Sequence, residues 1–145
     1  MKRAGFTMIE LIFVIVILGI LAAVAIPKLA ATRDDANIAK AATDVATALQ
    51  DMGAYYTAQG SFGNVADMTN VKFSSEGNIS SGPSYEVNNN PCVDFNTTEA
   101  AAADGNISIS FPTASDALCT KIQNVLAGKD MNKTHSFGGQ KVNWN

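Results

Sequence analysis

Glu10 is the residue whose type and position most clearly call for a chemical partner. It stands at the head of an apolar segment, and residues 11–26 contain no polar side chain. A carboxylate within a membrane core costs about 2.5–3.5 kcal/mol on insertion scales, so it needs a partner. A cut between Gly5 and Phe6 would place a new α-amino group one helical turn from Glu10, in the same chain or in a neighbouring copy. Alternatively, Glu10 reaches the lipid headgroups near a helix start, where the helix dipole favours an anion.

The two cysteines, Cys92 and Cys119, form a second candidate pair. They lie 27 positions apart, which fits neither a CxxC redox motif nor a set of zinc ligands. In an exported domain this predicts a disulfide, worth about 3.5 kcal/mol by the chain-entropy model. In a cytosolic protein the alternative is two buried free thiols.

Four N-x-[ST] sequons each carry an acidic residue two positions before the asparagine: Asn78 with Glu76, Asn96 with Asp94, Asn106 with Asp104, and Asn132 with Asp130. The pattern resembles the extended acceptor motif D/E-x-N-x-S/T of bacterial oligosaccharyltransferases, so we expect glycosylation at these sites. The alternative is that Asp, Asn, Ser and Gly share a preference for turns. We expect Asn106 to share an outward strand face with Ser108, and Asn96 to lie in a loop.

No arrangement of residues resembles a catalytic site, and we expect neither enzyme activity nor a cofactor. His135 is the only histidine, and we expect it at the surface or in a hairpin. Residues 128–145 carry one acid, Asp130, among three lysines, whereas a hard cation needs several oxygen ligands, so we expect no metal site. The net charge of −3, or −5 without Lys2 and Arg3, gives no electrostatic basis for binding nucleic acid.

The length of 145 residues allows one compact domain and one long helix. Residues 6–26 form an apolar run of 21 residues, which as a helix spans about 31 Å, enough to cross a bilayer core. Lys2 and Arg3 precede this run and no comparable basic cluster follows it at once. The positive-inside rule therefore leaves the N-terminus in the cytoplasm and sends the remainder outward.

The N-terminal residues resemble those of a known protein family. Residues 5–11, Gly-Phe-Thr-Met-Ile-Glu-Leu, and the apolar run that continues to Pro27 closely resemble the N-terminus of type IV pilins and of the pseudopilins of type II secretion systems. The resemblance covers roughly the first 30 residues. It implies that residues 1–5 are a leader, which prepilin peptidase removes between Gly5 and Phe6, and that Phe6 becomes an N-methylated N-terminus.

The same resemblance assigns roles within the helix. Glu10 matches the glutamate that registers an incoming subunit against its neighbour. Gly19 and Pro27 match positions between which the helix loosens when subunits pack, and both residues weaken a helix interior. An alternative is an ordinary signal peptide, because Ala23-Val24-Ala25 would permit a cut before Ile26. Glu10 and the very short basic leader oppose that alternative.

An amphipathic pattern occupies residues 28–59. Apolar residues recur there at steps of four and three, namely Ile38, Ala42, Val45, Leu49, Met52 and Tyr56. No cap separates this half from residues 6–27, so one continuous helix is predicted over about residues 6–59, with Gly60 as its C-cap. We expect the stripe to pack against the chain's own C-terminal domain.

Residues 60–145 are predicted to form a small, disulfide-closed β-rich domain. Candidate strands are 71–73, 85–87, 93–95 and 107–111. Thr113 or Ser115 is expected to cap a helix over 116–127 that Gly128 closes, with Leu118, Ile122 and Val125 on its apolar face and Cys119 at the border of that face. Gly138-Gly139 predicts a hairpin between 135–137 and 141–144, with Trp144 at the edge of the core. The whole is an α+β fold of the pilin type, a long helix packed on a small antiparallel sheet with one further helix.

These observations predict a structural subunit, a pilin or pseudopilin. It would wait in the inner membrane with its domain in the periplasm, then assemble into a type IV pilus or a secretion pseudopilus that serves adhesion, motility, protein secretion or DNA uptake. Its partners would be copies of itself and related pilins, prepilin peptidase and the inner-membrane assembly platform. The alternative is an anchored adhesin or binding module at a filament tip.

Overall fold

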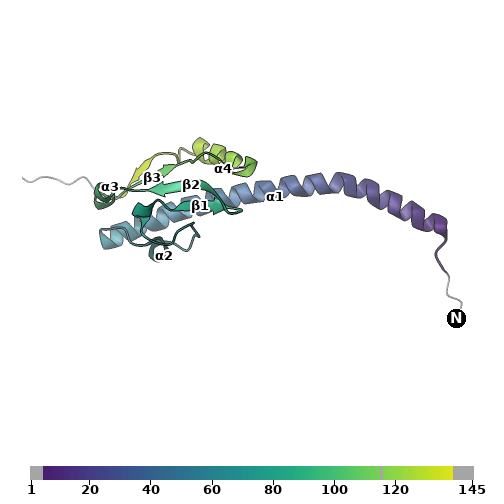
Figure 1. Ribbon diagram of the computed structural model, residues 1–145, viewed down its shortest axis with the longest axis horizontal. Coiled ribbons are helices and arrows are strands. Elements are labelled where there is room, and N and C mark those ends of the chain that lie inside the picture. Colours follow the sequence, from purple (N-terminus) through teal and green to yellow (C-terminus); the bar gives the residue numbers. More distant parts are fainter. Residues whose placement is uncertain (1–4, 115, 139–145) are drawn as a thin grey trace, which may run out of the picture. The chain divides into compact units, whose positions relative to one another are not determined.

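A computed structural model describes residues 5–114 and 116–138 of the chain. The chain forms two compact units that divide between Asn37 and Ile38. A single helix, α1 (Met8–Gln59), runs through the division without a break (Figure 1). Gly60 ends it in the left-handed conformation at φ 73°, and its N–H donates to the carbonyl of Tyr56 at 2.7 Å. The predicted continuous helix and its glycine cap are confirmed.

The second unit contains a four-stranded antiparallel sheet in the order β1-β2-β3-β4. The strands are β1 (Ser84–Val87), β2 (Asn90–Asn96), β3 (Asn106–Ser110) and β4 (Thr134–Ser136). Three short helices lie in the connections, α2 (Val65–Met68), the 3₁₀ helix η1 (Ile79–Ser81) and α3 (Glu99–Ala103). A long helix packed on a small antiparallel sheet with a further helix confirms the predicted α+β fold.

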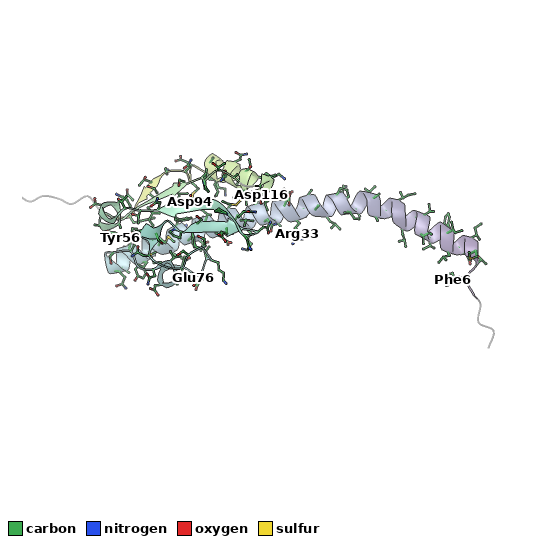
Figure 2. The ribbon with its side chains drawn as sticks, viewed as in Figure 1. Phe6, Arg33, Tyr56, Glu76, Asp94 and Asp116 are labelled. Atoms are coloured by element: carbon green, nitrogen blue, oxygen red, sulfur yellow. A yellow bond between two sulfur atoms is a disulfide. The ribbon has the colours of Figure 1, made fainter. Side chains whose placement is uncertain are left out.

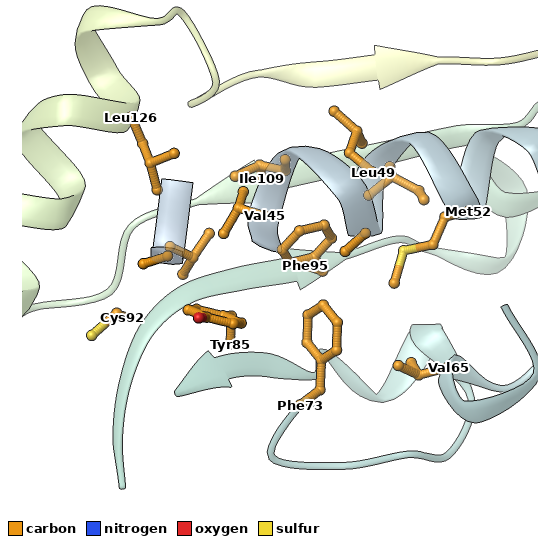
Figure 3. Packing of buried hydrophobic residues seen from close by; sticks show 14 of the residues in the cluster. Val45, Leu49, Met52, Val65, Phe73, Tyr85, Cys92, Phe95, Ile109 and Leu126 are labelled. Carbon is orange, nitrogen blue, oxygen red and sulfur yellow. The ribbon is translucent and has the colours of Figure 1, made fainter. Parts of the chain in front are cut away.

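The core of the second unit lies between the later turns of α1 and one face of the sheet (Figure 3). Val45 and Met52 of α1 are fully buried, as is Phe95 of β2. In β3 the buried side chains Ile107 and Ile109 alternate with more exposed serines, as the two-residue period of a strand requires. The strand predicted over 107–111 is therefore confirmed with its bounds shifted by one residue, and Phe111 follows it half-buried.

The expected strand at 71–73 is wrong. These residues form an irregular segment, although Phe73 is buried and its ring meets that of Phe95 edge to face, with centroids 5.0 Å apart. The apolar pattern reflected burial and not pairing in a sheet. Aromatic packing holds this segment against the core without a ladder of backbone hydrogen bonds.

The further helix, α4 (Ala117–Gly128), confirms the predicted element but corrects both of its caps. Asp116 caps its start, where its Oδ1 accepts the N–H of Cys119 at 2.6 Å, in place of Thr113 or Ser115. Gly128 is the last helical residue, and Lys129 follows as the C-cap. Asp116 immediately precedes the first helical residue, Ala117, and from this position its side-chain oxygen reaches an N–H of the first turn.

The buried face of α4 also differs from the expected one. Cys119, Ile122 and Leu126 are buried, whereas Leu118 is half-buried and Val125 is 39% exposed. The bridge from Cys119 to Cys92 of β2 turns the Cys119 face of the helix toward the sheet. Residues three and seven positions further along then follow it inward.

Of the two strands of the predicted C-terminal hairpin, the structure describes only residues 135–137. His135 lies in β4, which pairs with β3 through Ile107, and this pairing was not predicted from the sequence. Gly139, residues 141–144 and the expected core position of Trp144 lie outside the described residues.

Candidate functional site

The N-terminal half of α1 exposes a long apolar surface. From Phe6 to Leu29 its large hydrophobic side chains are between 40% and 89% exposed (Figure 2). In the part of the chain that the structure describes, α1 is the helix long and apolar enough to cross a membrane. An apolar surface of this extent marks a site that lipid or protein covers.

Thr7 and Glu10 form a capping box at the start of α1. The backbone N–H and the hydroxyl of Thr7 both donate to Glu10 Oε2, at 2.8 and 2.7 Å. In return the N–H of Glu10 donates to the Thr7 hydroxyl at 3.3 Å. Such a reciprocal pair satisfies donors that a helix start otherwise leaves free. Sequence reasoning missed Thr7 as a partner, although Thr-x-x-Glu is itself the signature of a capping box.

This capping box supplies Glu10 with partners inside its own chain. Both bonds that Glu10 accepts end on Oε2, and Oε1 accepts none from any residue in 5–114 or 116–138. The carboxylate therefore keeps one oxygen for a further donor.

The expected processing junction lies in an open stretch of backbone. Gly5 and Phe6 precede the first helical residue, Met8, and both are exposed. A side chain built on Gly5 would meet no atom of the described chain within 4 Å. The geometry is that of a peptide bond accessible to a protease.

Gly19 and Pro27 both lie inside α1, in an unbroken run of helix. Pro27 has no N–H to donate to the carbonyl of Ala23, so the helix lacks one of its bonds there. A side chain built on Gly19 would meet nothing within 4 Å in the described chain. Neither residue is required by a contact that the structure shows, and their role in loosening the helix stays a prediction.

Cys92 and Cys119 form the predicted disulfide, with their Cα atoms 5.2 Å apart and both residues fully buried. The bridge ties α4 to β2. Near it, the Gln123 amide donates to the carbonyl of Cys92 at 3.0 Å, which joins α4 to β2 again, and to the carbonyl of Pro112, in the connection before α4, at 2.8 Å. These contacts give the pair a structural role.

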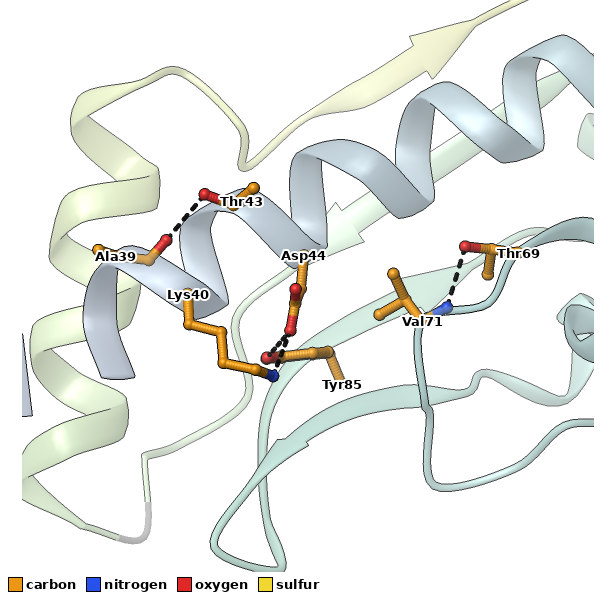
Figure 4. Close-up of polar contacts among 7 residues, drawn as sticks. All are labelled: Ala39, Lys40, Thr43, Asp44, Thr69, Val71 and Tyr85. Atoms are coloured by element: carbon orange, nitrogen blue, oxygen red, sulfur yellow. Dashed lines mark hydrogen bonds and ion pairs between the residues drawn. The ribbon is translucent and has the colours of Figure 1, made fainter. Parts of the chain in front are cut away.

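A polar cluster of Lys40, Asp44 and Tyr85 joins α1 to β1 (Figure 4). The Tyr85 hydroxyl donates to Asp44 Oδ2 at 2.7 Å, and Lys40 Nζ lies 2.8 Å from the same oxygen. Burial of the phenol, followed by its bond to the Asp44 carboxylate, raises the pKa of Tyr85 above the ordinary value of 10.0. The cluster holds two elements together.

His135 lies in β4, half-buried, with a ring nitrogen 3.2 Å from the carbonyl oxygen of Met131. Within the residues that the structure describes, no three His, Cys, Asp or Glu side chains come together in a way that could hold a metal ion. The arrangement around His135 is therefore that of a strand residue bonded to the preceding turn.

The four sequons lie on different elements of the second unit. Asn78 precedes η1, and Asn132 lies between α4 and β4. Asn106 is the first residue of β3, and Asn96 is the last residue of β2, which corrects the expectation that Asn96 lies in a loop.

Comparison with known proteins places the N-terminal segment. Residues 1–26 match the model of the family described as the prokaryotic N-terminal methylation motif. This motif is the signature of type IV pilins and pseudopilins, and the resemblance of the N-terminal residues is confirmed. No curated protein and no solved structure matches the chain.

Proposed function

We propose that the chain is a structural subunit, a pilin or pseudopilin, that leaves the inner membrane to assemble into a helical filament. The observation that carries this proposal is the exposed apolar surface of α1 from Phe6 to Leu29, headed by the capped carboxylate of Glu10. The part of this surface from Phe6 to Ile26 belongs to the segment that matches the methylation motif.

The apolar surface needs a cover both before and after assembly. Each large apolar side chain transferred out of water contributes about 1.5–3 kcal/mol, so the segment is stable only in lipid or against other apolar surfaces. Lipid covers it while the chain waits in the membrane, with its second unit in the periplasm. Neighbouring copies of the same helix cover it in the filament, so one surface serves both states.

Glu10 supplies the register between subunits. In the membrane its Oε2 accepts the two bonds from Thr7. In the filament Oε1 accepts from the α-amino group of Phe6, which prepilin peptidase creates, on the same or a neighbouring chain. An apolar core penalises a carboxylate without such a partner, so subunits packed out of register are disfavoured.

The alternative function, an anchored adhesin at a filament tip, would use the same anchor. It predicts a trace component, whereas a structural subunit accounts for most of the filament mass. Abundance in purified filaments therefore separates the two functions.

Photo-crosslinking tests whether the apolar surface is an interface between copies. A photoreactive phenylalanine in place of Phe13, which is 66% exposed within the apolar run, should give a ladder of homo-oligomers in cells with the assembly platform. Cells lacking the platform should give mainly monomer. Crosslinks that never join two copies of this chain would refute the proposal.

A further inference from the structure

The four sequons differ in how accessible the folded domain leaves them. An N-glycan acceptor is typically an exposed asparagine in a surface loop. In the extended motif a transferase must also reach the acid two positions before the asparagine and the hydroxyl two positions after it. The structure therefore ranks the sites by the contacts of all three side chains.

Asn96 and Asn106 lie in paired strands of the sheet. Asn106 belongs to β3, which has strands on both sides, and its Oδ1 accepts the Ser136 hydroxyl at 2.5 Å. Asn96 is exposed but stands between Phe95 and Thr97, which are buried. The flanking groups of the Asn96 motif also have partners, because Asp94 accepts the Ser84 hydroxyl at 2.6 Å and the Thr98 hydroxyl oxygen accepts the N–H of Ala101 at 3.2 Å.

Asn132 is exposed between α4 and β4, yet the flanking groups of its motif are engaged. The acid, Asp130, pairs with Lys133, and this contact lowers the pKa of Asp130. The hydroxyl of Thr134 bonds to that of Ser108 at 2.8 Å across the pair β3–β4. For a transferase to recognise this motif, Asp130 would have to leave Lys133 and the Thr134 hydroxyl would have to leave Ser108.

In the Asn78 motif the asparagine is exposed, and the two flanking side chains that a transferase reads are exposed and have no partner in the described chain. Glu76, Asn78 and Ser80 are all exposed, and Figure 2 shows Glu76 at the rim of the domain. Among the described residues no hydrogen bond or ion pair engages the Glu76 carboxylate. Asn78 Oδ1 accepts the N–H of Ser80 at 2.8 Å, and Nδ2 of Asn78 has no acceptor in the described chain.

The backbone around Asn78 is nevertheless held in place. Ile79 is 1% exposed and packs in the core, while the carbonyl of Gly77 accepts the N–H of Val65 at 2.9 Å. The sequon is therefore presented on a fixed support with its three recognition side chains outside.

We propose that Asn78, recognised together with Glu76 and Ser80, is the N-glycan acceptor of the folded domain. Nδ2 of Asn78 forms a bond to the anomeric carbon of a polyprenyl-diphosphate-linked oligosaccharide. The bond from that carbon to the diphosphate oxygen breaks, the lipid diphosphate leaves, and the amide proton passes to solvent. The inference rests on the proposed function only in requiring export of the domain.

The test is intact-mass and peptide mass spectrometry of the full chain from membranes of its native host. Wild-type protein should carry an oligosaccharide mass on the peptide containing Asn78. Asn78→Gln and Ser80→Ala should both lose this mass, and Ser80→Ala keeps the Asn78 side chain. Ser80→Thr, the matched control, preserves the sequon and should retain it, as should Asn106→Gln.

Glu76→Gln tests the role of the acid, because it changes only the charge of an exposed side chain, and it should lose most of the modification. An unmodified Asn78 in molecules that begin at Phe6 and hold the disulfide would overturn the inference while leaving the proposed function intact. Molecules that begin at Met1 with free thiols would instead contradict export and the proposed function. Glycan on Asn106 or Asn96 with Asn78 bare would show modification before folding and would also overturn it.

Discussion

Glu10 and Thr7 define the chemistry at the start of α1. Glu10 could be identified from the sequence as a residue that needs a partner, because a charged side chain in an apolar run has few stable environments. The sequence instead suggested as its partner the α-amino group that a cut before Phe6 would create. The capping box shows that the uncut chain already provides the carboxylate with two donors.

Replacing Glu10 with valine should separate membrane insertion from assembly. Insertion should be unchanged or improved, because a polar group leaves the apolar segment, while filament assembly should fail because the register is lost. Membrane fractionation and filament yield measure the two effects, with Ile9→Val as a matched change beside Glu10. Normal filament yield from Glu10→Val would mean that the charge has no role.

The free energy of unfolding should depend on pH in the alkaline range because of Tyr85. Its pKa is raised in the folded state, so its contribution is complete below pH 10.0, the ordinary pKa, and is lost as the pH rises from there through the raised pKa. Tyr85→Phe should cost about 1–2 kcal/mol near neutral pH, because a bond to a charged acceptor is removed.

Urea unfolding of the full chain in detergent measures this difference at about pH 8 and about pH 11. The advantage of wild type over Tyr85→Phe should shrink at the higher pH. A difference that stays constant between the two would mean that the phenol does not titrate differently on folding.

The presence of each helix was easier to predict than which of its faces is buried and which element it packs against. The 4-3 spacing along α1 predicted its buried stripe, because a long helix with one apolar side has one way to bury it. For α4 the same reasoning chose a face that includes Val125, since Leu118, Ile122 and Val125 also follow helical spacing. The bridge of Cys119 to β2 decides between the two faces, and spacing within one helix carries no information about it.

Two alanine substitutions in α4 test its orientation. Ile122→Ala should cost about 2–4 kcal/mol, because a fully buried side chain leaves a cavity. Val125→Ala, on the exposed side of the same helix, should cost less than about 1 kcal/mol. Equal losses in urea unfolding would contradict the orientation of α4.

The disulfide should contribute at least as much to stability as a typical buried side chain in α4. Replacing both Cys92 and Cys119 with serine should destabilise the domain by about 2–5 kcal/mol, because the loop it closes gains freedom when unfolded. A lower melting temperature and faster proteolysis are the expected observations, and reduction of the wild type should reproduce them. Reactive thiols in denatured, unreduced native protein would show that the bridge does not form in the cell.

At the scale of the whole molecule, the uneven composition of the chain predicted the fold class well. An apolar run followed by a polar region predicted a long apolar helix and a small β-rich region, and the structure contains both. The strand expected at 71–73 does not form. The ring of Phe73 packs on Phe95 in the core, so this segment buries its apolar residue without pairing in a sheet. Pairing between β3 and β4 joins residues about 30 positions apart along the chain, and local sequence patterns carry no information about such a distant pairing.

The central claim is that this chain, cut before Phe6, forms the body of a filament. Mass spectrometry of filaments isolated from the native host, combined with N-terminal sequencing, tests it most directly. We expect most of the filament mass to be this chain, and its first residue to be N-methylated Phe6. Filaments that contain it only in trace amounts, or whose copies begin at Met1 or Ile26, would show that it is not the filament subunit.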